Sequence, residues 1–162
     1  MADGLDVRRN GVSIATLRPT RRGLAVEYAP ELIAGAAAGS IVLSCSVPMR
    51  SGRQDATGWA RWLLPEGQHL LALAAAADVA ASDTFGMLDR YGRDIAGAFE
   101  VVAVGASTRE PRAVPYGPGE LDVEVAELGS NPLGIHGDSE LSLAGLQDKL
   151  VVVATADGWA RP

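Results

Sequence analysis

The dipeptide Asn10-Gly11 separates two short runs in which apolar and polar residues alternate, at 5–7 and 12–15. Asn-Gly is the preferred pair for the type I′ turn of a β-hairpin, because both central residues of that turn take a positive φ. Residues 24–28 repeat the alternation after Arg22-Gly23, which predicts a third strand. The chain is therefore expected to begin as a small antiparallel sheet.

Three further segments of the first hundred residues carry simple local signals. Pro30-Glu31 favours a short helical turn through Ile33, because proline is tolerated at the first position of a helix. Residues 41–47 predict a strand that ends before Pro48, and residues 98–104 predict another.

Between these strands the apolar spacing becomes helical. A helix is expected from Thr57, with Thr57 as its N-cap. Pro65 disfavours helix at the residue before it and offers a new helix start, so two helices are expected to meet there. Ser82 or Asp83 can cap a third helix, which Gly92 ends.

The last forty residues carry fewer regular signals. A strand is expected around 121–125 and a stronger one at 150–154, where valines follow one another. Asp157-Gly158 is a turn signal, after which 159–162 is expected to return as a strand.

Residues 106–120 contain Pro111, Pro115 and Pro118 with little periodicity, which favours a linker. We therefore divide the chain into an N-terminal subdomain at 1–105, a linker at 106–120 and a second segment at 121–162. The predicted fold class is α+β, with a small antiparallel N-terminal sheet or barrel that carries a helical insert.

Composition limits the class of protein. The chain has 162 residues, 48% of them hydrophobic, and a net charge of −6, as in an ordinary globular protein. Its longest apolar run, 70–77, is far shorter than the ~20 residues of a membrane span. Asp3 and Asp6 stand where a secretory leader would be apolar, so we expect a cytoplasmic protein without a membrane segment. Cys45 is the only cysteine, which excludes an internal disulfide, and it is expected to be a small buried side chain.

The acidic balance argues against direct nucleic-acid binding, which needs clustered lysine and arginine. Five arginines do gather near the first two turns, and we interpret them as solvated charge: Arg8, Arg9, Arg18, Arg21 and Arg22. His69 and His136 lack regular ligand spacing, so no metal site is expected. Trp59 and Trp62 are expected to pack in the core, with an exposed binding anchor as the alternative.

Three separated motifs, at 63–67 (LLPEG), 92–98 (GRDIAGA) and 141–149 (LSLAGLQDK), identify a family. Their sequence, order and spacing resemble those of HipA-type serine/threonine kinases. Residues 28–31 and 43–48 are similar to the first subdomain of that family. The resemblance covers nearly the whole chain and implies that the second segment begins a kinase-like N-lobe sheet.

Residues 142–149 form a glycine-bearing segment before an apolar strand, where backbone N–H groups can approach a phosphate. From the residues alone, an ordinary hairpin loop is the simpler interpretation. The resemblance implies that Ser142 is the serine whose phosphorylation displaces the phosphate-binding loop, while a turn-capping hydroxyl is the alternative. The resemblance also implies ATP contacts from six residues: Ala144, Gly145, Leu146, Gln147, Asp148 and Lys149.

Phosphoryl transfer needs a lysine on the phosphates, an acid that accepts the hydroxyl proton, and carboxylates that hold Mg²⁺. After Lys149 the sequence has Asp157 as its only carboxylate side chain. We therefore expect the N-terminal part of a HipA-like toxin kinase of a type II toxin-antitoxin system, inactive by itself and without catalytic residues. Complete family members use ATP and Mg²⁺, and this chain is expected to bind neither tightly.

The resemblance implies a HipB-like helix-turn-helix antitoxin as partner. The alternative is a free-standing regulatory module that binds and inhibits a separate HipA-like catalytic chain, as some split systems resembling this family do. Retention of residues 142–149 favours the first hypothesis. Truncation at Pro162 is expected to uncover an apolar face, which predicts self-association.

Overall fold

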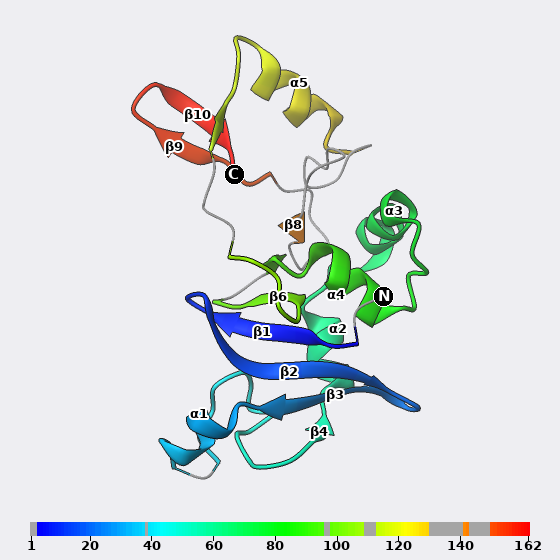
Figure 1. Ribbon diagram of the computed structural model, residues 1–162. Coiled ribbons are helices and arrows are strands. Elements are labelled where there is room, and N and C mark those ends of the chain that lie inside the picture. The colour runs from blue at the N-terminus through cyan, green and yellow to red at the C-terminus, as the bar shows by residue number, and fades with distance from the viewer. Residues whose placement is uncertain (1–2, 38, 96–97, 109–112, 130–140, 143–149) are drawn as a thin grey trace.

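The computed structural model describes residues 3–37, 39–95, 98–108, 113–129, 141–142 and 150–162 (Figure 1). Its main feature is an antiparallel sheet of five strands in the order β4-β3-β2-β1-β6. The strands are β1 (Leu5–Arg9), β2 (Val12–Thr20), β3 (Gly23–Tyr28), β4 (Gln54–Asp55) and β6 (Glu100–Ala103). Together with the helices, this sheet confirms the predicted α+β class.

The first hairpin forms as predicted. Asn10 and Gly11 have φ angles of 51° and 76°, and Arg9 pairs with Val12 across the turn. The third strand and the strand near residue 100 are also confirmed, and β6 pairs with β1 at the far edge of the sheet. The chain thus comes back to pair with β1 after a long insertion that contains the helices.

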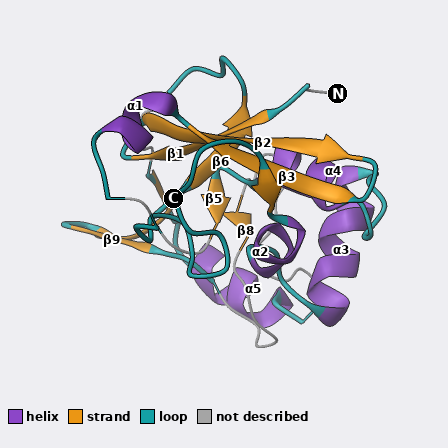
Figure 2. Cartoon of the chain, turned by 90° about the horizontal axis from the view of Figure 1, so that it is seen from below, coloured by secondary structure: helices purple, strands orange, loops and turns teal. Residues whose placement is uncertain are grey.

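Four helices belong to this part of the chain: α1 (Pro30–Ala34), α2 (Thr57–Trp62), α3 (Gly67–Ala77) and α4 (Thr84–Tyr91). The last three lie on one side of the five-stranded sheet (Figure 2). Buried side chains from the sheet and from these helices form one apolar core, which includes Leu5, Leu17, Leu73, Leu88 and Val101. Burial of this shared face is the main favourable contribution to folding.

The predicted helix boundaries hold with one correction. Pro65 separates α2 from α3, and the Asp83 carboxylate caps α4 by accepting a hydrogen bond from Gly86 N at 3.0 Å. Thr57, however, is the first residue of α2 and does not cap it. Its hydroxyl instead accepts from Leu24 N at 2.9 Å, because β3 passes beside the start of α2 and leaves that amide without a strand partner.

The strand predicted at 41–47 is wrong. This segment is a series of turns with a single bridge between Ser44 and Val47, and the edge position of the sheet belongs to β4. Val47 is buried and its carbonyl accepts a hydrogen bond from the Tyr28 hydroxyl at 2.5 Å, so the segment is fixed by a side chain rather than a strand. Cys45 in this loop is exposed, which corrects its predicted burial.

The C-terminal part contributes a second, smaller sheet. A sheet of three strands has the order β7-β10-β9, from β7 (Val114–Pro115), β9 (Val153–Thr155) and β10 (Gly158–Arg161). The predicted returning strand is confirmed as β10, while β9 begins three residues later than the predicted strand at 150–154. β7 lies inside the predicted linker, and the boundaries of that linker remain a prediction.

The strand predicted at 121–125 is wrong, because α5 (Glu120–Glu127) occupies this segment. Gly119 precedes it with a φ of 78°, and Glu120 accepts a hydrogen bond from Gly117 N at 2.9 Å. Acidic residues in a first helical turn are stabilised by the helix dipole, and this turn has Glu120 and Asp122. The valines at alternate positions suggested a strand, but the turn before them starts a helix.

Among the helices of the described residues, none has both the length and the apolar character that a membrane span requires.

Candidate functional site

The second and third sequence motifs meet in space. β5 (Asp94–Ile95) and β8 (Leu141–Ser142) form a parallel pair, with Asp94 opposite Leu141 and Ile95 opposite Ser142. Ile95 is buried at the edge of the N-terminal core. The backbone of Ser142, the predicted phosphorylation position, is therefore aligned with an anchored strand of the N-terminal unit.

Gly92 lies two residues before β5 and is closely packed. It is the C-cap of α4 with a φ of −70°, so no left-handed conformation requires glycine there. Its carbonyl accepts a hydrogen bond from Val101 N at 2.6 Å. A Cβ at this position would lie 2.3 Å from the Val101 carbonyl oxygen and 2.4 Å from that of Leu88. The glycine of the second motif is thus required by close packing between α4 and β6.

The six predicted ATP contacts, Ala144, Gly145, Leu146, Gln147, Asp148 and Lys149, lie outside the described residues, and their role stays a prediction. Asp157 is exposed in the turn between β9 and β10. In the part of the chain that the structure describes, no three His, Cys, Asp or Glu side chains gather as a metal site would require. The described residues therefore give Mg²⁺ no carboxylate cluster.

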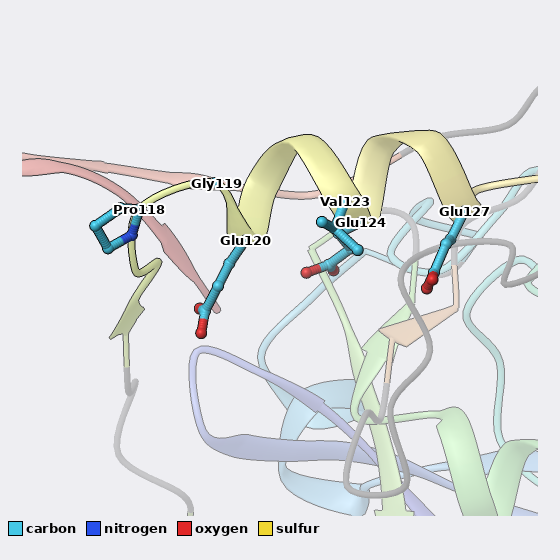
Figure 3. Close-up of a pocket in the computed structure, with 6 residues that line it drawn as sticks. All are labelled: Pro118, Gly119, Glu120, Val123, Glu124 and Glu127. Carbon is cyan, nitrogen blue, oxygen red and sulfur yellow. The ribbon is translucent and has the colours of Figure 1, made fainter.

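Sequence reasoning missed a hollow on α5, because a strand was expected there. It has a volume of about 370 Å³ and a mainly apolar lining, formed by Pro118, Gly119, Glu120, Val123, Glu124 and Glu127. The three glutamates extend from the same side of the helix (Figure 3), since residues three and four positions apart share a helical face. The lining is therefore mainly apolar, and the carboxylates of Glu120 and Glu124 lie within reach of Arg161.

Arg161 of β10 joins the last strand to α5. Its Nε lies 2.9 Å from Glu124 Oε2, and its guanidinium carbon lies 4.5 Å from the centre of the Tyr116 ring. The hydrogen bond to Glu124 raises the pKa of Arg161. The Tyr116 hydroxyl is buried beside this ion pair. This cluster fixes the helix on the small sheet.

Replacing Arg161 with methionine is expected to lower the free energy of unfolding by about 2 kcal/mol, because it removes the guanidinium that pairs with the buried Glu124 carboxylate at 2.9 Å. The Glu124 side chain is only 7% exposed, whereas that of Glu120 is 52% exposed and lies 3.7 Å from Arg161. Glu120→Gln is therefore the matched control, with an expected loss below about 0.5 kcal/mol. Urea unfolding measures both, and equal losses would contradict the assignment of Glu124 as the main partner.

Stability is expected to fall in alkaline solution. Burial raises the pKa of all three tyrosines, Tyr28, Tyr91 and Tyr116, above the ordinary value of 10.0. The unfolded chain then releases phenolic protons that the folded chain retains, so stability is complete below that value and decreases as pH rises through it. Melting temperatures measured from about pH 8 to about pH 11 should therefore decline at the upper end. A constant melting temperature across this range would contradict the prediction.

The two tryptophans of α2 have different environments. Trp59 is buried at 7% exposure, which confirms core packing for it, whereas Trp62 is 74% exposed. α2 ends at Trp62, and the next residues, Leu63 and Leu64, take the positions that face the core. Trp62 thus fits the alternative of an exposed anchor.

The five arginines near the first turns do not form one patch. Arg8 is buried, and its guanidinium donates to the Ala106 carbonyl at 2.7 Å. Arg9 lies at the opposite end of β2 from Arg21 and Arg22, which are exposed in the β2–β3 turn. This separation agrees with the interpretation of the arginines as individual solvated or paired charges.

Known proteins resemble both parts of this chain. Residues 5–102 match the family model described as the HipA N-terminal domain. The chain is 34% identical over 134 residues to the protein named "Putative kinase Y4mE" of Sinorhizobium fredii, an alignment that covers 76% of this chain and 32% of the relative. It also shares its fold with a protein in the solved complex of the Shewanella oneidensis MR-1 toxin-antitoxin system HipA, HipB and its operator DNA, with a TM-score of 0.68 and 24% identity. That likeness covers 97% of this chain and 37% of the other, so the chain spans about a third of the length of both relatives.

Proposed function

Because the chain belongs to the HipA N-terminal domain family, we propose that it is the N-terminal part of a HipA-like serine/threonine-protein kinase toxin of a type II toxin-antitoxin system. The match over residues 5–102 carries this proposal, since it includes the five-stranded sheet except for the last residue of β6, and the helices beside it. The S. fredii relative, which is named as a kinase, and the S. oneidensis complex of HipA with HipB support the same assignment.

In this proposal the 162 residues alone do not transfer phosphate. Catalysis of phosphoryl transfer relies on carboxylates that hold Mg²⁺ and on an acid that accepts the hydroxyl proton. After Lys149 the sequence has Asp157 as its only carboxylate side chain, and this is the observation on which this part of the proposal rests. Residues 144–149 contact ATP and Ser142 accepts phosphate only when the chain works with a catalytic segment that supplies those groups. The working location is the cytoplasm.

The proposed partner is a HipB-like helix-turn-helix antitoxin. The S. oneidensis HipA protein is solved together with HipB and operator DNA, which supports a partner of this kind. In our proposal this chain does not contact the DNA itself, since its net charge is −6 and the exposed Arg9 lies at the opposite end of β2 from Arg21 and Arg22.

A kinase assay tests the proposed inactivity. The purified chain is incubated with ATP and Mg²⁺, ATP binding is followed by calorimetry, and phosphate on Ser142 is sought by mass spectrometry. We expect no phosphate and no tight binding. Phosphate on Ser142 without another kinase present would show that the chain holds catalytic groups of its own and would overturn the proposal.

The second candidate is a free-standing regulatory module that binds and inhibits a separate HipA-like catalytic chain. The exposure of Trp62 favours it, since tryptophan is enriched among the residues that dominate binding energy at protein interfaces. Such a module needs no ATP contacts of its own.

Adding the chain to a catalytic segment distinguishes the two candidates. The probe is the S. fredii relative without the third that this chain matches, assayed for autophosphorylation with ATP and Mg²⁺. Restored activity on addition of the chain supports an N-terminal part of a kinase. Reduced activity that Trp62→Ala relieves supports an inhibitory module. Trp159→Ala, which removes another exposed tryptophan, is the matched control and should change neither result.

A further inference from the structure

The chain leaves the five-stranded sheet through a tight turn at the end of β6. Ala106 N donates a hydrogen bond to the Ala103 carbonyl at 2.9 Å, and Gly105 has a φ of 82°. A positive φ at the third of four residues is typical of a type II β-turn, which reverses the direction of the chain. Val104 N donates to the Gly4 carbonyl at 3.2 Å, which attaches the turn to the residue before β1. Ala106, the first residue of the predicted linker, is therefore turned back toward the sheet.

A buried arginine of β1 holds this turn. Arg8 is 7% exposed, and its Nη2 donates a hydrogen bond to the Ala106 carbonyl at 2.7 Å. The same nitrogen lies 3.4 Å from Asp6 Oδ2. A hydrogen bond from a charged donor is about twice as strong as one between neutral groups. The start of the linker is thus tied to β1 by a bond between residues that are 98 positions apart in the sequence.

Asp6 and Arg8 lie on the face of the sheet that points away from α2, α3 and α4. Leu5 and Val7 belong to the core beneath those helices, and side chains alternate between the two faces of a strand. Val102 pairs with Asp6 and is buried at 4% exposure, although that core does not include it. The burial of Val102 agrees with a chain that turns back over this face after β6.

A buried charge at this position is not explained by stability alone. Methionine fills a similar space without desolvation of a guanidinium, and a buried ion pair often gives no more stability than an apolar side chain. What arginine adds is direction, because its charged head is fixed between Asp6 and one backbone carbonyl. The pairing of β1 with β2 also shifts by one residue between Val7 and Arg8, as in a β-bulge, and bulges change the direction of a neighbouring side chain.

The C-terminal part of the chain is attached to the N-terminal part at a second place as well. After the turn at Gly105 the chain passes through β7 and α5 before β8 pairs with β5. Ile95 of β5 is buried in the core, so this second attachment is also anchored. The segment between Ala106 and Leu141 is thus held at both ends, and release of one end leaves it able to turn about the other.

We propose that Arg8 is a positioning residue that acts with the Gly105 turn. The two fix the direction in which the linker leaves the five-stranded sheet, and thereby the placement of the small sheet. Loss of the bond between Arg8 and the Ala106 carbonyl leaves both sheets folded but allows several placements of one relative to the other. This proposal does not depend on kinase activity.

Distances between two spin labels test the proposal. Cys45 is the only cysteine and is exposed, in a loop that the Tyr28 hydroxyl holds through the Val47 carbonyl. Asp157→Cys supplies the second label, in the exposed turn before β10. Double electron-electron resonance of the doubly labelled chain is expected to give one narrow distance distribution, because the proposal fixes the placement of the small sheet.

Arg8→Met in the doubly labelled chain is expected to broaden this distribution about twofold or more, because the start of the linker loses its bond to β1. Arg53→Met is the matched control. The Arg53 side chain is 65% exposed and lies 3.3 Å from Glu27 of the same sheet, so its loss should leave the distribution unchanged. Circular dichroism verifies that both variants fold.

Substitutions at Gly105 test the same turn without removing the buried guanidinium. Among the described residues nothing lies within 4 Å of a Cβ added there, so a substitution acts through φ alone. Gly105→Val is expected to broaden the distribution as Arg8→Met does, because a β-branched residue is strained at a positive φ. Gly105→Asn should keep it narrow, because asparagine tolerates that conformation. A broad distribution in the wild-type chain, no broadening in either Arg8→Met or Gly105→Val, or equal broadening by a variant and its control overturns the proposal.

Discussion

Gly92→Ala is expected to lower the free energy of unfolding by about 3 kcal/mol, at the upper end of the cost of overpacking a core. The added methyl group would meet two backbone carbonyl oxygens, those of Val101 at 2.3 Å and Leu88 at 2.4 Å. Backbone atoms cannot rotate away as a side chain does, so α4 and β6 must separate. Urea unfolding followed by circular dichroism measures the loss.

Gly58→Ala is the matched control for this prediction. Gly58 lies in α2, is exposed, and has nothing within 4 Å of an added Cβ. Alanine there is expected to raise the free energy of unfolding by up to about 1 kcal/mol, because it restricts the unfolded chain and favours helix. The same chemical change thus has opposite signs at the two glycines. A loss at Gly92 no larger than about 0.5 kcal/mol would contradict the close contact.

Leu73→Ala is expected to lower the free energy of unfolding by about 3 kcal/mol, within the range for truncation of a fully buried leucine. Leu73 has 0% exposure in α3 and belongs to the core shared with the sheet. Its carbonyl also accepts a hydrogen bond from the Tyr91 hydroxyl at 3.0 Å, so a shift of α3 disturbs the contact with α4. Thermal unfolding and urea unfolding both report the change.

Leu71→Ala removes the same atoms two residues earlier in the same helix. Leu71 is 52% exposed, so the expected loss stays below about 0.5 kcal/mol. The comparison separates burial from helix propensity, because both substitutions place alanine inside α3. Similar losses at the two positions would indicate that α3 does not pack on the sheet through Leu73.

The candidate sites differ in how far the sequence predicted them. The motifs at 92–98 and 141–149 were evident along the chain, and their meeting through β5 and β8 required the tertiary structure. The α5 hollow was not predicted, because the alternating valines at 121–125 suggested a strand. The signal that could have located the helix is Gly117-Pro118-Gly119 followed by Glu120 and Asp122, a turn and an acidic first helical turn.

The amino-acid sequence by itself determined the elements whose causes are local. The Asn10-Gly11 turn, the break at Pro65 and the Asp83 cap depend on backbone conformation and on hydrogen bonds within a few residues, so they could be predicted without a partner. The family motifs could also be found from the sequence alone, because each of them is a run of neighbouring residues.

Only the tertiary structure decided which of two similar residues is buried. Trp59 faces the core and Trp62 does not, Leu73 is enclosed and Leu71 is not, and Cys45 is exposed although apolar residues precede it in its loop. Burial depends on which element packs against a residue, and that element lies far away in sequence.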